Sequence, residues 1–501
     1  MESIPEWKKD VASFYMHRRS RVMEPRLIEY MASFAYRMAG GEYLWIPRLM
    51  SSIFWLIGAV FLYLTAERIT FSGAAALFST AFYLFLPISI LGSRSILAEP
   101  LMIMMLLVGL FTILRYYERP SVFRLAATAG VSALAIFIKP MCMFLLFGAF
   151  VALSVNRHGV WKTVISRRLL VFTVLSLLPV TAYFFLTGFF RDELLEQSQI
   201  SFIPQLLLSP SFWKDWLAMV GSVVGYIALT AALAGILRFR QGIPRAMITG
   251  LWIGYFVFGL SFNNRITVHD YYHLQLIPVV ALSLGPIGAD AIRHITDYVR
   301  AQRWRISALA ILLLVLSGAG IFTISRLQWR EATPDLRNKM EIMGSIFGIN
   351  PQFIKFVKPD FTEEVETARE IGEIVGHTTK VITLSSNYGE LLAYYGELTA
   401  YPWQTSLTFQ IYKMQGINVP PIDELFNTFY KRWGFPSYFI ITDFRELDRQ
   451  PELKNFLDKN FPVMIRNNNY LIYDLREKTA LSFTMAKNIL AGAGDTGTQA
   501  Q

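Results

Sequence analysis

The sequence contains little charge and almost no cysteine. Only 17% of its 501 residues are charged, whereas a soluble protein carries about a quarter. Its single cysteine, Cys142, excludes a disulfide within the chain and a thiolate metal site, and we expect it to pack as a small apolar residue. No P-loop, dinucleotide fingerprint or serine nucleophile elbow is found in the sequence.

The charge that is present is mostly basic. The formal net charge is +10, but no basic stripe with interleaved aromatic residues occurs, so we expect no nucleic-acid partner. Much of the excess lies in short connectors between apolar runs, where it indicates membrane topology and attraction to anionic lipid.

Apolar residues dominate the chain, at 53% with a mean hydropathy of +0.38. Between residues 46 and 326 they form about ten blocks, and each is close to the roughly 17–25 residues that cross a bilayer. The blocks are 46–65, 71–91, 97–114, 122–138, 141–155, 169–190, 212–237, 246–262, 274–292 and 306–325. The predicted fold class is therefore a polytopic α-helical membrane protein, with residues 46–326 as its transmembrane domain.

The connectors between the blocks alternate in charge. One set contains about fifteen Lys and Arg residues and the other only about five, so the positive-inside rule makes the first set cytoplasmic. The connectors with few cations contain Arg94, Lys139, Arg191, Lys214 and Arg265. We therefore expect a multi-pass protein of the plasma (inner) membrane, with these five residues on the extracytoplasmic side.

The first 45 residues do not fit this topology easily. The parity of the topology, that is, the alternation of connectors between the two sides of the membrane, places this segment outside the cytoplasm. Yet the segment is basic, and no signal peptide precedes it. Either the native chain begins earlier with a helix that is absent here, which we favour, or the parity is wrong by one helix. Apolar residues at helical spacing over 27–38 predict an amphipathic helix in the membrane interface.

After residue 326 the composition changes to that of a folded extracytoplasmic α/β domain, predicted over 327–480. We expect a helix over 361–375, buried strands at 380–385 and 438–442, and a hairpin over 462–475 that turns at Asn467–Asn469. The remaining tail, 481–501, ends in small polar residues and is predicted to be disordered.

Charged residues at membrane depth are costly and point to function. Glu99 and Arg94 belong to one short extracytoplasmic connector, and Lys139 lies between two apolar blocks. Glu99 is either paired with Arg94 or available to bind a metal or an acceptor. Lys139 either extends to the interface or supplies a point charge for a phosphate.

The segment 263–278 has the highest density of reactive side chains. It contains Arg265, His269, Asp270, Tyr271, Tyr272 and His273 directly before a helix. An aromatic interfacial anchor with a capping aspartate is one interpretation, and an anion site at the helix N-terminus is another. A metal held by His269, Asp270 and His273 is a third interpretation, because residues i and i+4 share a helical face.

Four short motifs, in order along the chain, resemble a known family. They are EPRLI at 24–28, SRSILAEP at 93–100, IKP at 138–140 and HDYYHLQLIP at 269–278. The set is similar to that of the polyprenol-phosphate-sugar-dependent glycosyltransferases of the C-type fold, namely protein O-mannosyltransferases and lipid A aminoarabinose transferases. The chain departs from the family at its start, where the family has a membrane helix followed by a loop with an acidic catalytic base.

The resemblance implies a membrane glycosyltransferase that moves a sugar from a polyprenyl-phosphate donor to a protein, glycan or lipid acceptor outside the cytoplasm. It assigns Glu99 to catalysis through acceptor or metal contact, and the donor to Arg94, Lys139, Arg265, His269, Tyr271, Tyr272 and His273. A divalent metal is the one cofactor considered. The rival interpretations are a flippase for a lipid-linked substrate, although no internal repeat supports it, and an inactive lipid-binding relative.

Overall fold

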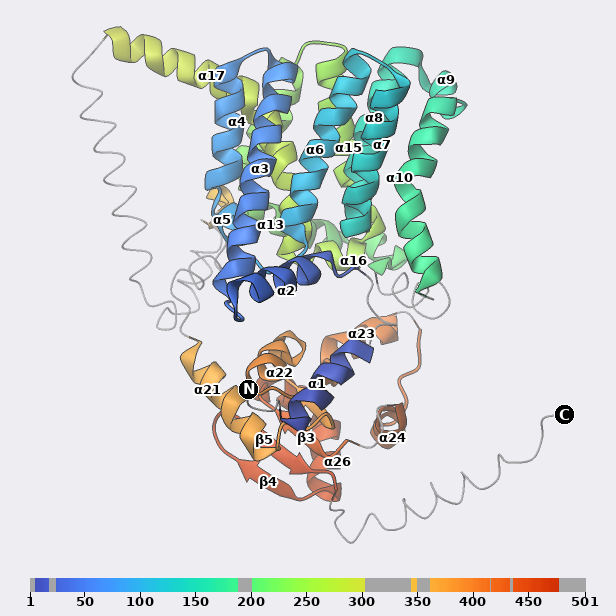
Figure 1. Cartoon of the computed structure of the whole chain (residues 1–501), viewed down its shortest axis with the longest axis vertical. Helices are drawn as coiled ribbons and strands as arrows, with labels where there is room; N and C mark the ends of the chain where they lie inside the picture. Colours follow the sequence, from blue (N-terminus) through green and yellow to red (C-terminus); the bar gives the residue numbers. More distant parts are fainter. Residues whose placement is uncertain are drawn as a thin grey trace, which may run out of the picture. The chain divides into compact units, whose positions relative to one another are not determined.

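The computed structural model describes residues 5–17, 24–187, 201–301, 344–348, 361–414, 416–432 and 436–476 (Figure 1). The chain divides into two compact units. Arg21–Pro359 form a helical unit, and Met1–Ser20 join Asp360–Gln501 in a second unit. The predicted span 306–325 and the tail 481–501 lie outside the described residues.

The helical unit is a bundle with short 3₁₀ turns between its helices. Its α-helices are α2 (Leu27–Ala39), α3 (Trp45–Thr70), α4 (Gly73–Phe85), α5 (Pro87–Gly92), α6 (Glu99–Glu118), α7 (Val122–Ile138), α8 (Met143–His158), α9 (Val160–Val164), α10 (Arg167–Leu186), α13 (Pro210–Val224), α14 (Tyr226–Gly235), α15 (Ile243–Ser261), α16 (Asn263–Ile266) and α17 (Leu276–Ala301). The turns are η2 (Pro140–Cys142), η3 (Pro204–Leu208), η4 (Ile236–Arg238) and η5 (Asp270–Gln275). The amphipathic helix predicted over 27–38 is confirmed as α2, whose Phe34 and Met38 are exposed.

Among the described helices, six are long and apolar enough to cross a membrane, or seven if α13 and α14 count as one bent span. Two more apolar helices, α4 and α7, are shorter. The predicted number of ten spans is therefore not reproduced in the described residues, and it stays a prediction.

Two predicted blocks are broken where backbone chemistry interrupts a helix. The block 212–237 bends by 91° between α13 and α14, at Gly225, whose φ of +82° is accessible mainly to glycine. The block 71–91 ends its first helix at Leu86, which precedes Pro87 and is extended with ψ of 132°. Hydrophobicity alone does not reveal either break, because both lie within continuous apolar sequence.

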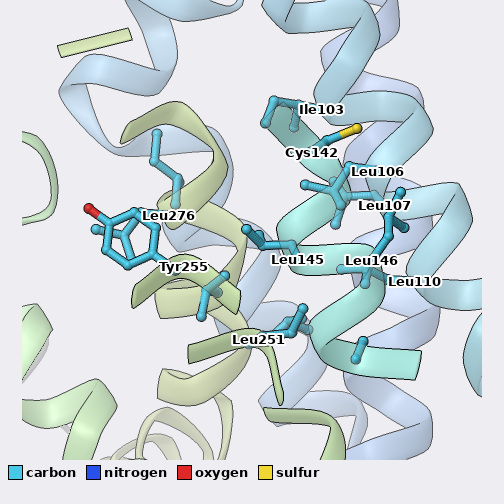
Figure 2. Packing of buried hydrophobic residues seen from close by; sticks show 14 of the residues in the cluster. Ile103, Leu106, Leu107, Leu110, Cys142, Leu145, Leu146, Leu251, Tyr255 and Leu276 are labelled. Atoms are coloured by element: carbon cyan, nitrogen blue, oxygen red, sulfur yellow. The ribbon is translucent and has the colours of Figure 1, made fainter. Parts of the chain in front are cut away.

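The core of the bundle depends on close contact between α8 and α15. A Cβ added at Gly148 would collide with the carbonyl oxygen of Gly250, and one at Gly254 with that of Phe144. Small residues let two helix backbones approach in this way, which favours packing inside a membrane. Figure 2 shows the surrounding layer of buried side chains, which includes Leu106, Leu107, Leu145, Leu146, Leu251 and the free Cys142, confirmed as a packed core residue.

The second unit confirms the predicted α/β domain. Its sheet has the order β2-β1-β3-β5-β4, with β1 parallel to β2 and β3, and with β5 antiparallel to β3 and β4. The strands are β1 (Val381–Leu384), β2 (Tyr401–Pro402), β3 (Tyr438–Ile441), β4 (Val463–Arg466) and β5 (Leu471–Asp474). Its helices are α21 (Thr362–Ile374), α22 (Glu390–Tyr395), α23 (Ser406–Met414), α24 (Ile422–Arg432), α25 (Phe444–Asp448) and α26 (Pro451–Asn460), with the turn η7 (Ser386–Gly389). The helix, strands and hairpin predicted for this region are all present.

The N-terminal helix α1 (Glu6–His17) packs on this α/β domain. The ring of Trp7 stacks on His377 with centroids 4.0 Å apart, and Lys8 forms an ion pair of 2.9 Å with Glu397. The chain start thus groups with the C-terminal domain rather than with α2. The sequence contains no periodic signal for this contact, because it joins residues that are hundreds of positions apart.

Candidate functional site

A buried lysine between two carboxylates lies at one end of the helical unit. The Nζ atom of Lys139 is 2.5 Å from Oε1 of Glu99 and 2.9 Å from Oε1 of Glu24. The side chains of Glu99 and Lys139 are 2% and 8% exposed, whereas that of Glu24 is 30% exposed. Glu24 is therefore the carboxylate of this triad that solvent can reach.

Local backbone chemistry positions each member of this triad. Lys139 precedes Pro140, which disfavours helical backbone, so α7 ends and Lys139 is extended with φ of −153° and ψ of 113°. Glu99 is the first residue of α6, followed by Pro100, where the missing N–H has no helical partner to lose. Glu24 lies in the approach to α2, also directly before a proline.

Hydrogen bonds from α3 hold the connector that carries Arg94. The hydroxyl of Ser51 donates to the Ser95 carbonyl at 2.7 Å, and that of Ser52 donates to the Ser93 carbonyl at 3.1 Å. Arg94 itself is exposed. Among the described residues no carboxylate pairs with it, so the alternative of an Arg94–Glu99 ion pair is not what the structure shows. The partner of Glu99 is Lys139.

The aromatic residues of η5 form one wall beside the triad. The Nζ atom of Lys139 lies 5.5 Å from the ring centroid of Tyr271. The ring of Tyr271 lies 5.0 Å from Tyr272, and His269 is 5.1 Å and 5.6 Å from these two rings. A cluster of rings beside a cation is suited to an apolar chain that ends in a polar or charged head.

The positive charge around this wall affects His269, which is half-buried just before η5. Burial lowers the pKa of the imidazole, and the charges of Arg265 and Lys139 lower it further. The two cations therefore act on one ring from within electrostatic range. The lowered pKa favours the neutral form of His269, so the positive charge beside this wall comes from Arg265 and Lys139.

His273 lies inside the core, unlike the other residues predicted to bind the sugar donor. It is fully buried, its Nδ1 atom is 2.6 Å from the Tyr255 hydroxyl, and its Nε2 atom is 2.7 Å from the Ile266 carbonyl oxygen. Since Nε2–H donates to that carbonyl, Nδ1 accepts from the hydroxyl. Both ring nitrogens are used inside the protein, so this side chain positions η5 and is not available to a ligand.

A second internal contact fixes the helix that carries Arg265. The side-chain amide of Asn263 is fully buried, accepting from the Ile203 amide at 2.9 Å and donating to the Ile203 carbonyl at 3.0 Å. This paired bond attaches η3 and its neighbours to α16. Arg265, half-buried on the same helix, is held close to the aromatic wall as a result.

The residues that the structure describes do not offer a set of ligands for the metal interpretation. Within the described ranges no group of three His, Cys, Asp or Glu side chains is arranged to hold a metal ion. His273 is committed to Tyr255 and Ile266, which removes it from the set of His269, Asp270 and His273.

Glu24, the third member of the Lys139 triad, was not predicted from the sequence. Its position inside the EPRLI motif was visible, but its contact with Lys139 joins residues from two distant segments. The available signal was a proline-flanked carboxylate shortly before an amphipathic helix, which is too common to select one residue.

Comparison with known proteins gives a family match over part of the chain and a likeness to solved structures. Residues 24–195 match the family model of dolichyl-phosphate-mannose-protein mannosyltransferase. This match confirms the resemblance to glycosyltransferases of the C-type fold over the segment that contains Glu24, Arg94, Glu99 and Lys139. No curated protein sequence matches the chain.

Two solved structures similar to this chain are both ArnT from Cupriavidus metallidurans. The apo structure matches with a TM-score of 0.53 at 14% identity, covering 90% of this chain and 87% of that one. The structure bound to undecaprenyl phosphate matches with a TM-score of 0.49 at 15% identity, covering 90% and 88%. The apo match shows that the chain has an ArnT-like membrane fold, which confirms the predicted class. Together with the family match, it supports a membrane glycosyltransferase.

Proposed function

We propose that this protein transfers a sugar from a polyprenyl-phosphate carrier to a hydroxyl or phosphate group of an acceptor at the extracytoplasmic face. One observation carries the proposal. Lys139 lies between the Glu24 and Glu99 carboxylates, beside Tyr271, and the lysine and both carboxylates belong to the segment that matches the mannosyltransferase family.

The chemistry needs a proton acceptor and positive charge in one place. The acceptor oxygen attacks the anomeric carbon, the bond from that carbon to the phosphate oxygen breaks, and polyprenyl phosphate leaves with the bonding electrons. The acceptor proton passes to a carboxylate, which we assign to Glu24, because solvent can reach it, whereas Glu99 is buried and holds Lys139. Cations near the phosphate stabilise the charge that develops on it.

The cations of the site have donors available for this phosphate. The ammonium of Lys139 has three N–H donors, and two of them point to Glu24 and Glu99. We assign the third, together with Arg94 and Arg265, to the phosphate oxygens. The rings of His269, Tyr271 and Tyr272 would line the path of the lipid headgroup, whereas His273 holds this wall in place.

The test uses membranes that contain the full chain and two labelled donors, mannosyl and aminoarabinosyl phosphoundecaprenol. We expect label to move from one of them to an acceptor. The variants Glu24→Gln and Glu99→Gln should each transfer at least about a hundredfold more slowly, the first through loss of the general base and the second because Lys139 loses its buried partner. The control Glu67→Gln removes an exposed carboxylate at the opposite end of α3 and should transfer normally.

Other outcomes separate the rival functions. Normal transfer by Glu24→Gln or by Glu99→Gln would refute the role given to that residue. No transfer with either donor, combined with tight binding of undecaprenyl phosphate, would identify a lipid-binding protein. Donor that crosses the bilayer of sealed vesicles without losing its sugar would identify a flippase. In a binding assay with undecaprenyl phosphate, Arg265→Gln should weaken affinity about tenfold, while the exposed Lys162→Gln should not.

A further inference from the structure

A cavity lies in the helical unit, away from the Lys139 triad. It has a volume of about 260 Å³ and is lined by the α3–α4 connector, the 238–240 segment and α17. The lining includes Thr70, Ser72, Arg238, Arg240, Asp290 and Arg293. We call it the arginine cavity.

The arginine cavity and the triad are at opposite ends of the bundle. Ser51 and Ser52, near the start of α3, bind the connector before Glu99, whereas Thr70 is the last residue of α3. At 1.5 Å per residue, the helix between them is about 28 Å long, close to a hydrocarbon core of about 30 Å. Figure 1 shows these two ends, with α2 and α16 at the lower end and the later part of α17 at the upper end.

Positive charge in the arginine cavity exceeds negative charge. Asp290 pairs with Arg238 at 3.4 Å, and both side chains are exposed enough for this pair to be weak. Among the described residues no carboxylate pairs with Arg240 or Arg293. Three guanidinium groups therefore face one carboxylate, which favours an anion of at least two charges or one strongly hydrogen-bonded oxyanion.

The backbone adds to this preference for an anion. Ser72 and Ala75 line the cavity, so the first turn of α4 faces it, although the Ala75 amide is already bonded to the Ser72 hydroxyl at 3.3 Å. The amide groups of a first turn have no helical partners, and the helix dipole favours negative charge there. The cavity is also smaller than the roughly 300–1,000 Å³ that holds a whole drug-sized ligand, which suits a headgroup.

Exposed apolar side chains place the cavity beside the acyl chains of the membrane lipids. Phe71 and Leu237 are 65% and 75% exposed, and each is next to a lining residue in the sequence. The Arg240 guanidinium lies over the Phe71 ring at 5.1 Å from its centroid. In a bilayer these side chains contact lipid, so a lipid bound in the cavity by its headgroup can keep its acyl chains in the membrane.

We propose that the arginine cavity binds the phosphate group of an anionic phospholipid, with its acyl chains along Phe71 and Leu237. This site is separate from the donor site and does not depend on which sugar the protein transfers. Its ligand is a membrane component, so occupancy would depend on the lipid composition of the bilayer.

The test measures lipid binding to the purified full chain in a neutral detergent. The probes are phosphatidylglycerol, phosphatidylcholine and inorganic phosphate, and the readouts are bound lipid by native mass spectrometry and the shift in melting temperature. We expect phosphatidylglycerol to bind and to raise the melting temperature more than phosphatidylcholine. Removing one arginine should weaken phosphatidylglycerol affinity about fivefold, and Arg238→Gln/Arg240→Gln/Arg293→Gln by about a hundredfold.

A matched triple variant distinguishes the cavity from general surface charge. Arg119→Gln/Lys162→Gln/Arg167→Gln removes the same charge from exposed positions at the same end of the bundle. It should keep wild-type affinity, and Arg240→Lys/Arg293→Lys should retain most of it and report on folding. Equal losses in the two Gln triples would overturn the proposal. A shift with inorganic phosphate as large as with phosphatidylglycerol would overturn the lipid assignment.

Discussion

Replacing Lys139 by methionine removes the cation from the Lys139 triad while keeping a side chain of similar length. Glu99, only 2% exposed, then lies at a helix start without a positive partner, and Glu24 loses the same contact. The Glu99 carboxyl must either stay charged without its partner or take up a proton, and both raise the free energy of the folded state at pH 7.

The expected magnitude follows from the burial of the pair. Breaking a buried ion pair by removing one partner costs about 3–5 kcal/mol, because the remaining charge is uncompensated. For a domain of this size, 1 kcal/mol corresponds to about 2–4 °C in melting temperature. We therefore expect Lys139→Met to melt about 10 °C below the wild type in scans at one fixed rate, with tryptophan fluorescence as the readout.

A double variant tests whether the uncompensated charge of Glu99 causes this loss of stability. In Lys139→Met/Glu99→Gln no uncompensated charge remains at Glu99, so the double variant should recover a large part of the lost stability. Lys162→Met, which removes an exposed lysine at the opposite end of the bundle, serves as the control and should change little. If Lys139→Met melted within about 1 °C of the wild type, or if the double variant were the less stable of the two, the reasoning would be wrong.

The remaining predictions concern packing and the α/β domain. Gly148→Ala forces a Cβ into the Gly250 carbonyl, so we expect a loss of about 1–3 kcal/mol, seen as earlier melting and a lower yield of folded protein. Burial alone would raise the pKa of Glu446, but hydrogen bonds from Ser406 and Gln450 outweigh it and lower the pKa below 4.5. Its stabilisation is thus present above pH 4.5 and is lost as pH falls through the folded pKa, so Glu446→Gln should speed proteolysis of the domain at pH 7 and have less effect near pH 3. Trp7→Ala removes the ring stacked on His377 and should speed cleavage of the N-terminal helix by trypsin.

Much of the secondary structure could be predicted from the sequence, because the signals are local. A run of apolar residues predicts a buried or spanning helix wherever it occurs, and alternating β-branched and aromatic residues between turn signals predict strands. The helix α21 and the hairpin of β4 and β5 follow these rules directly. The same rules fail at Gly225 and Pro87, because a single residue there changes the backbone inside an apolar run.

The site could be predicted in part. Glu99 and Lys139 stood out because charge in apolar surroundings is costly and rare, and proline after each of them marked a helix boundary. Their pairing with one another, and with Glu24, could not be derived, since three helices had to pack before the distances existed. His273 shows another limit of the sequence, because its hydrogen bond to the Tyr255 hydroxyl inside the core could not be predicted from its place in the motif.

By itself the sequence determined the membrane class, the α/β character of the second domain and the short list of charged residues at one end of the bundle. Only the tertiary structure decided which carboxylates neutralise Lys139, which histidine is committed to the core and which arginines share one cavity. The reason is physical. Hydrophobicity and backbone propensity act on neighbouring residues, whereas ion pairs, cavities and close helix contacts depend on distances between segments far apart in the chain.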